Sequence, residues 1–110
     1  MADYCRREEI ELICTVSAVT PYRLNLERHD QAHEYFTELC GALEIPFYDM
    51  NYAKAQYLPR TNEMFVDYEG HMQGDMAVRQ SEFLAEVLRA EHPESFFETD
   101  YQTLLESLPQ

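Results

Sequence analysis

The clearest pattern of hydrophobic and polar positions in the chain runs from residue 65 to residue 88. Two apolar residues, Phe65 and Val66, are followed by a polar loop that contains two glycines. Beyond Asp75 the apolar residues recur every three or four positions, as on one face of a helix. They are Met76, Ala77, Phe83, Leu84, Val87 and Leu88. We therefore expect a short extended segment, a tight loop and an amphipathic helix over about residues 72–90.

The pattern upstream predicts a strand, a helix and a second strand. Residues 10–16 form an almost unbroken apolar run that is typical of a strand covered on both faces. Residues 26–43 have the spacing of a helix with one apolar face, made of Ala32, Tyr35, Phe36, Leu39, Cys40 and Leu43. Residues 45–48 predict a short second strand. Because such a connection is almost always right-handed, the two strands should be parallel neighbours in one sheet.

Turn-forming residues separate these elements. Thr20 and Pro21 should end the first strand and open a loop over residues 17–25, with Asn25 as the N-cap of the next helix. Residues 2–9 have the pattern of the end of a helix, and Pro93 should stop the helix over 72–90. We therefore divide the chain into a partial α/β domain over residues 1–92 and an acidic helical tail over residues 93–110.

The composition limits the partners. The chain has 21 acidic and 8 basic residues and a net charge of −13. Such a surface repels phosphate backbones and anionic lipids, which argues against a nucleic-acid or membrane-surface partner. No apolar run approaches the ~20 residues of a membrane span, and the first residues lack the apolar core of a signal peptide. We expect a soluble cytoplasmic protein without a membrane span and without a cofactor.

The cysteines and histidines have spacings that bear on disulfide and metal sites. Cys5, Cys14 and Cys40 are odd in number and form no Cys-x-x-Cys pair, so no disulfide framework or zinc ribbon is indicated. His29 and His33 have the four-residue spacing of zinc-binding helices, but no third ligand is spaced behind them. Because their neighbours are charged, we predict a solvated pair of histidines and no metal site, with a metal site on this pair as the alternative.

The polar loop and two upstream segments resemble a known family. The segments are FVDYEGHMQGDMAVRQSEFLAEVL, IELICTVSAVTP and IPFYDMN. Over about residues 8–90 the chain resembles the carboxyl-terminal half of SGNH/GDSL-type hydrolases, especially the branch related to the bacterial proteins that D-alanylate lipoteichoic acid. The resemblance implies part of a flavodoxin-like three-layer α/β fold with a short parallel sheet. The family usually places the Asp three residues before the His, whereas here Asp67 is four before His71 and Tyr68 occupies the usual place.

The resemblance also implies an activity, namely an esterase or acyltransferase acting on cell-envelope polysaccharide. His71 would be the general base, and Asp67 or Glu69 would orient its ring. Asp49 and Asn51 follow the second predicted strand, and parallel sheets place their sites at the carboxyl ends of strands, so we expect these two residues to bind substrate. The alternative is that His71 caps the helix that follows and that Asp67 is a turn residue.

A general base needs a nucleophile, and the family's Gly-Asp-Ser block is absent from these residues. The serines are Ser17, Ser81, Ser95 and Ser107, and none lies in a Gly-x-Ser-x-Gly context. The resemblance therefore implies a fragment that is inactive until it is joined to a missing N-terminal half. The competing interpretation is a noncatalytic acidic module that binds a basic partner through its Glu-rich helices and tail.

Two further expectations follow from the residues themselves. A two-stranded sheet has two open edges and little buried area, so we expect the chain to pair with another copy of itself or with another chain, such as the missing half, or else to be marginally stable alone. The chain also has eight tyrosines. Most should belong to the core and its rim, and the alternative is a sugar-binding or acyl-binding pocket lined by Tyr48, Tyr52 and Tyr57.

Overall fold

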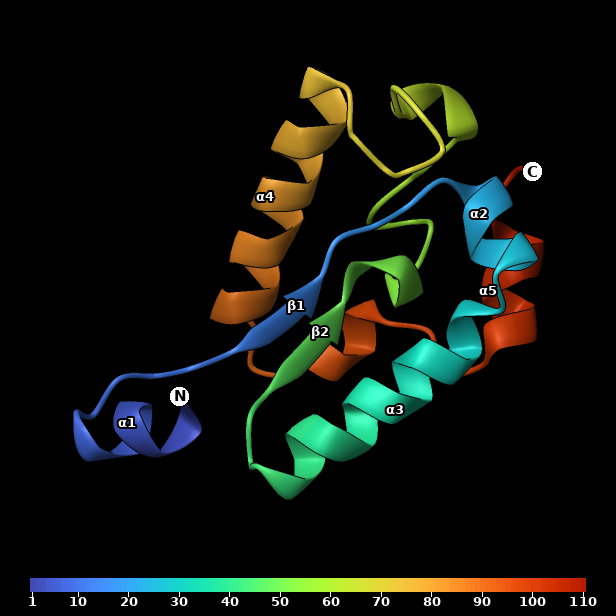
Figure 1. Cartoon of the computed structure of the whole chain (residues 1–110). Helices are drawn as coiled ribbons and strands as arrows, with labels where there is room; N and C mark the ends of the chain where they lie inside the picture. Colours follow the sequence, from blue (N-terminus) through green and yellow to red (C-terminus); the bar gives the residue numbers. More distant parts are fainter.

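Two short parallel strands lie at the centre of the structure, and helices α3 and α4 lie on opposite sides of them (Figure 1). The structure is a computed structural model that describes residues 1–110. Its elements in chain order are α1 (Ala2–Arg7), β1 (Cys14–Val16), α2 (Pro21–Leu26), α3 (His29–Ala42), β2 (Phe47–Asp49), η1 (Met50–Tyr52), η2 (Asn62–Met64), α4 (Gly74–Arg89), η3 (Pro93–Phe96) and α5 (Tyr101–Ser107). None of these helices combines the length and the apolar character that a membrane span requires.

The strands β1 and β2 confirm the prediction of a small α/β fold with a parallel pair. Cys14 lies opposite Phe47, and Val16 lies opposite Asp49, so both strands end at the same edge of the sheet. Both strands are shorter than predicted. Residues 10–13 do not belong to β1, and β2 begins only after Pro46. Pro46 has no N–H to donate, and its carbonyl accepts from the Cys14 amide at 2.9 Å.

Helix α3 connects the two strands, but its predicted apolar face is mostly uncovered. Cys40 is the one buried residue of α3, whereas Tyr35 is 57% and Leu39 42% exposed. The apolar face that the spacing predicted is therefore present, but most of it is not buried. The physical reason is the width of the sheet, because two strands cover only a narrow stripe of the helix that packs on them.

Helix α2 occupies residues for which we predicted a loop. Thr20 is its N-cap, and the Thr20 hydroxyl accepts from the Arg23 amide at 3.1 Å. Pro21 occupies the first helical turn, where its missing N–H costs nothing. Asn25, the predicted N-cap of the next helix, lies inside α2, and α3 begins after Arg28 without a side-chain cap.

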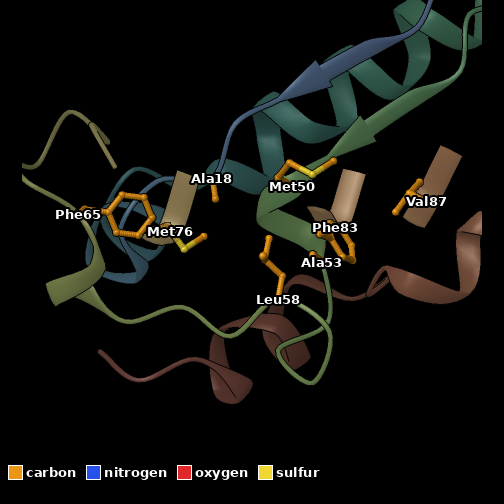
Figure 2. Packing of buried hydrophobic residues seen from close by; sticks show 8 residues of the cluster. All are labelled: Ala18, Met50, Ala53, Leu58, Phe65, Met76, Phe83 and Val87. Atoms are coloured by element: carbon orange, nitrogen blue, oxygen red, sulfur yellow. The ribbon is translucent and has the colours of Figure 1, made fainter. Parts of the chain in front are cut away.

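The main core lies between α4 and the segments that follow the two strands. Eight buried hydrophobic residues form it, as Figure 2 shows: Ala18, Met50, Ala53, Leu58, Phe65, Met76, Phe83 and Val87. Helix α4 supplies Met76, Phe83 and Val87 from the face that its periodicity predicted, so this helix is confirmed, whereas Ala77 and Leu88 of the same predicted face are exposed. A second cluster joins α2, η1 and α5 through Leu24, Tyr52, Leu104 and Leu108.

The C-terminal segment packs against the rest of the chain. Phe97 forms an antiparallel bridge with Ala53, and the Glu98 amide donates to the Tyr52 carbonyl at 2.7 Å. Asp100 caps α5 by accepting from the Thr103 amide at 2.9 Å. The acidic tail thus contains the further short helix that its pattern predicted.

Candidate functional site

Residues 65–72 form a small hairpin that presents Asp67 and His71. Phe65 and Met72 make an antiparallel bridge, and the Val66 amide donates to the His71 carbonyl at 2.6 Å. Gly70 has a φ of 98°, in the left-handed region that favours glycine. A Cβ at Gly70 would lie 3.2 Å from Cγ1 of Val19, which shows how closely the hairpin approaches the segment that follows β1.

Asp67 and His71 are brought together by this hairpin. Nδ1 of His71 lies 2.7 Å from Oδ2 of Asp67, and the His71 amide donates to Oδ1 of Asp67 at 3.2 Å. The hydrogen bond from the ring lowers the pKa of Asp67 below its usual value. The His71 side chain is 75% exposed, and its Nε2 makes no hydrogen bond within the chain. The pair therefore offers one imidazole nitrogen to solvent and holds the other.

The surroundings of His71 contain neither the alternative orienting residue nor a nucleophile. The Glu69 carboxylate makes no hydrogen bond to His71, and the Glu69 carbonyl accepts from Nη1 of Arg23 at 2.7 Å. Ser17 follows β1, but its hydroxyl accepts from Nε2 of Gln80 at 3.4 Å and makes no bond to His71. His71 thus has an acidic hydrogen-bond partner, and it makes no hydrogen bond to a hydroxyl or thiol of the chain.

Asp49, at the carboxyl end of β2, is the centre of a second polar cluster. Its side chain is fully buried, and its Oδ2 lies 2.6 Å from Nε2 of His29 and 3.1 Å from Nδ1 of His33. Its Oδ1 accepts from the backbone and side-chain amides of Asn51, both at 3.0 Å. Burial opposes ionisation of this carboxyl, but the hydrogen bonds from His29, His33 and Asn51 outweigh it and hold the pKa of Asp49 well below its usual range.

The prediction that His29 and His33 are a solvated pair was wrong. The four-residue spacing directs both rings from α3 toward the end of β2, where Asp49 meets them. The ring of His33 also stacks on Tyr52 with centroids 3.6 Å apart. The sequence carried a signal for this cluster, namely two histidines on one helix face followed by an acid at the end of the next strand.

Asn51 connects the cluster to the segment after β1. Its Oδ1 accepts from the Val19 amide at 2.9 Å, and its Nδ2 donates to the Ser17 carbonyl at 3.1 Å. Asp49 and Asn51 are both buried, and all of their observed partners lie within the chain. That these two residues bind substrate stays a prediction, and in the structure they fix the position of residues 17–19.

Arg60 is a buried residue that the sequence did not single out. It is 2% exposed, and its guanidinium donates to the carbonyls of Leu58, Asn51 and Ala53 at 2.9, 3.1 and 3.0 Å. Burial lowers the pKa of Arg60 to about 10, while the charge of Asp49 acts in the opposite direction. Arg60 therefore closes the turn that follows η1 and stabilises the backbone beside Asn51.

No group of three or more His, Cys, Asp or Glu side chains is arranged to hold a metal ion. The nitrogens of His29 and His33 that face Asp49 are occupied by hydrogen bonds to its carboxylate. All three cysteines are free thiols.

The predicted tyrosines divide between a cavity and the surface. Tyr48 and Tyr52 line a cavity of about 430 Å³ between α3, β2 and residues 93–99. Tyr57 lies outside this lining and packs edge-to-face on Phe96.

Comparison of the chain with models of known protein families, with curated proteins and with solved structures found no match.

Proposed function

We propose that this chain carries the proton-transfer half of an SGNH-type site that hydrolyses or transfers esters on cell-envelope polysaccharide. The observation that carries the proposal is the 2.7 Å contact between Oδ2 of Asp67 and Nδ1 of His71, with Nε2 of the same ring open to solvent. A carboxylate that fixes one imidazole nitrogen while the other faces substrate is the arrangement of an oriented general base.

In this proposal His71 and Asp67 have separate roles. Nε2 of His71 takes the proton of the attacking hydroxyl and later gives it to the leaving alcohol. Asp67 holds the Nδ1 proton in place and stabilises the positive charge that the ring gains. The double contact of Asp67, through the ring and the backbone amide of His71, supports this assignment because it fixes the acid and the base in one loop.

The place of the pair in the fold supports the proposal. The hairpin packs on Val19, just beyond the carboxyl end of β1, and the sites of parallel α/β proteins lie at such edges. Asp49 and Asn51 brace the same edge from β2. We propose that the small α/β fold of this chain is part of a flavodoxin-like three-layer fold.

The nucleophile is proposed to come from residues outside this chain, in a missing N-terminal half. The outer edge of β1 has no paired strand, and α3, which packs on β2, exposes apolar residues such as Tyr35 and Leu39. The missing half would pair a strand with the open edge of β1 and cover the exposed apolar side chains of α3. A second copy of the chain is the other partner that fits this surface.

Hydrolysis of p-nitrophenyl acetate by the chain tests the proposal. In the absence of the missing nucleophile, an imidazole nitrogen can itself attack this activated ester, which releases p-nitrophenolate and forms an acyl-imidazole that water hydrolyses. His71→Ala should lower the protein-dependent release of p-nitrophenolate by roughly tenfold or more, because the ring that Asp67 orients is lost. Asp67→Asn should lower it to an intermediate rate. His92→Ala is the matched control, since the side chains of His71 and His92 are both 75% exposed.

Two outcomes contradict the proposal. Equal rates in His71→Ala and His92→Ala would show that any exposed imidazole accounts for the reaction. No release above that of buffer with the unmodified chain would favour the noncatalytic acidic module, which binds a basic partner.

A further inference from the structure

The cavity between α3, β2 and residues 93–99 is lined mainly by aromatic and acidic side chains. Its volume is about 430 Å³, and no residue of the hairpin that holds Asp67 and His71 lines it. Its lining includes four aromatic residues, which are Phe47, Tyr48, Tyr52 and Phe97. It also includes three acidic residues, which are Asp49, Glu94 and Glu98. No lysine or arginine lines it. The wall is therefore aromatic and acidic.

His33 lines this cavity and has one ring nitrogen that can bond to a ligand. Its Nδ1 faces the ionised carboxylate of Asp49, and the ring is held between Tyr52, at 3.6 Å between centroids, and Phe47, at 5.9 Å. A carboxylate accepts hydrogen bonds, so Nδ1 carries the hydrogen, and in the neutral ring Nε2 is then an acceptor. Nε2 of His33 makes no hydrogen bond within the chain, and His33 lines the cavity.

Two carboxylates of the cavity, those of Glu94 and Glu98, are poorly neutralised, whereas Asp49 is buried and bonded to His29, His33 and Asn51. Glu98 forms no ion pair, and Glu94 only approaches Nδ1 of His92, at 3.6 Å between two side chains that are both 75% exposed. Such exposed pairs contribute little. The site thus offers acceptors and negative charge to a ligand, and its aromatic rings attract both apolar groups and cations.

We propose that this cavity binds a small organic amine. Its ammonium group pairs with the carboxylates of Glu94 and Glu98 and donates to Nε2 of His33, and its apolar body packs against Phe47, Tyr48 and Phe97. The chemical class follows from complementarity, because an anion would meet the carboxylates of Glu94 and Glu98, and a purely apolar ligand would leave the acceptors without a donor. This site uses no atom of the Asp67–His71 pair and stands independently of the ester chemistry proposed above.

Three probes that share a phenyl ring and a two-carbon chain test the charge preference. They are phenethylamine, 2-phenylethanol and phenylacetate, titrated into the chain and followed by calorimetry. Phenethylamine should bind threefold to tenfold more tightly than the alcohol, roughly the effect of one partly exposed ion pair. Phenylacetate should show no saturable binding. Equal affinities for the amine and the alcohol, or no saturable amine binding at millimolar concentration, would overturn the proposal.

Paired variants locate the site. The double variant Glu94→Gln, Glu98→Gln should weaken phenethylamine about threefold to tenfold and leave 2-phenylethanol unchanged. The control Glu86→Gln, Glu91→Gln removes the same charge from exposed positions outside the cavity and should leave both affinities unchanged. Melting curves check that each variant is folded.

Nuclear magnetic resonance of the histidine rings gives a readout that does not depend on any variant. Phenethylamine should shift the ring signals of His33 and leave those of His71 in place. Shifts at His71 without shifts at His33 would overturn the proposal even if the amine binds.

Discussion

Replacing Asp49 by Ala should lower the free energy of unfolding by about 3 kcal/mol or more. The carboxylate is fully buried and accepts from His29, His33 and two N–H groups of Asn51. Its removal leaves these buried donors without an acceptor and separates α3 from the end of β2. Urea unfolding followed by circular dichroism measures the loss. Asp3→Ala is the control, because the Asp3 side chain is 99% exposed and should change stability by less than about 0.5 kcal/mol.

The Asp49 effect should depend on pH with a defined sign. The pKa of Asp49 in the folded chain lies below its value in the unfolded chain, about 3.9. The stabilisation by Asp49 is therefore complete above about pH 5 and decreases as the pH falls through 4 toward the folded pKa. The difference in stability between the unmodified chain and Asp49→Asn should narrow below about pH 4. A difference that is constant from neutral pH to pH 3 would contradict ionisation of Asp49 in the fold.

Replacing Arg60 by Met should also destabilise the fold, by about 3 kcal/mol. Met fills most of the volume but donates nothing to the carbonyls of Leu58, Asn51 and Ala53, which the guanidinium now serves. Arg60→Lys should be intermediate, because a single ammonium lacks the planar fork that reaches three carbonyls. The same unfolding measurement applies.

The control for Arg60 is Arg89→Met at the exposed end of α4, which should change stability by no more than about 0.5 kcal/mol. Burial lowers the pKa of Arg60 to about 10, so its charge is held at a cost. If Arg60→Met is as stable as the unmodified chain, the three hydrogen bonds only offset the free energy required to bury the charge. Arg60 would then make no net contribution to the stability of the fold.

The elements with a strong local pattern could be predicted from the sequence. Helix α4 has apolar residues at regular helical spacing, and Met76, Phe83 and Val87 are buried as that spacing requires. The parallel pairing of β1 and β2 followed from the handedness of strand-helix-strand connections, which needs no knowledge of side-chain contacts. Asp67 and His71 lie four residues apart in one tight loop, so their contact was within reach of the sequence.

The remaining features depend on contacts between segments that are distant in the chain. The two-strand width of the sheet, and with it the exposure of Tyr35 and Leu39, is set by how many strands pair, which the pattern of α3 does not encode. Asp49 meets His29 and His33 only because β2 ends beside α3. Helix α2 is different, since Thr20 and Pro21 are a helix-start signal that we interpreted as the end of a strand.

If Asp67 holds His71 as an oriented base, the neutral ring of His71 should have a single tautomer. Nitrogen-15 resonance of the imidazoles at a pH where they are neutral distinguishes a hydrogen on Nδ1 from one on Nε2. We predict that His71 carries its hydrogen on Nδ1, facing Asp67, and that Asp67→Asn abolishes this preference. His92 is the control, because its Nδ1 lies 3.6 Å from Glu94, beyond a hydrogen bond. A His71 ring with the same tautomer mixture as His92 would contradict the oriented base.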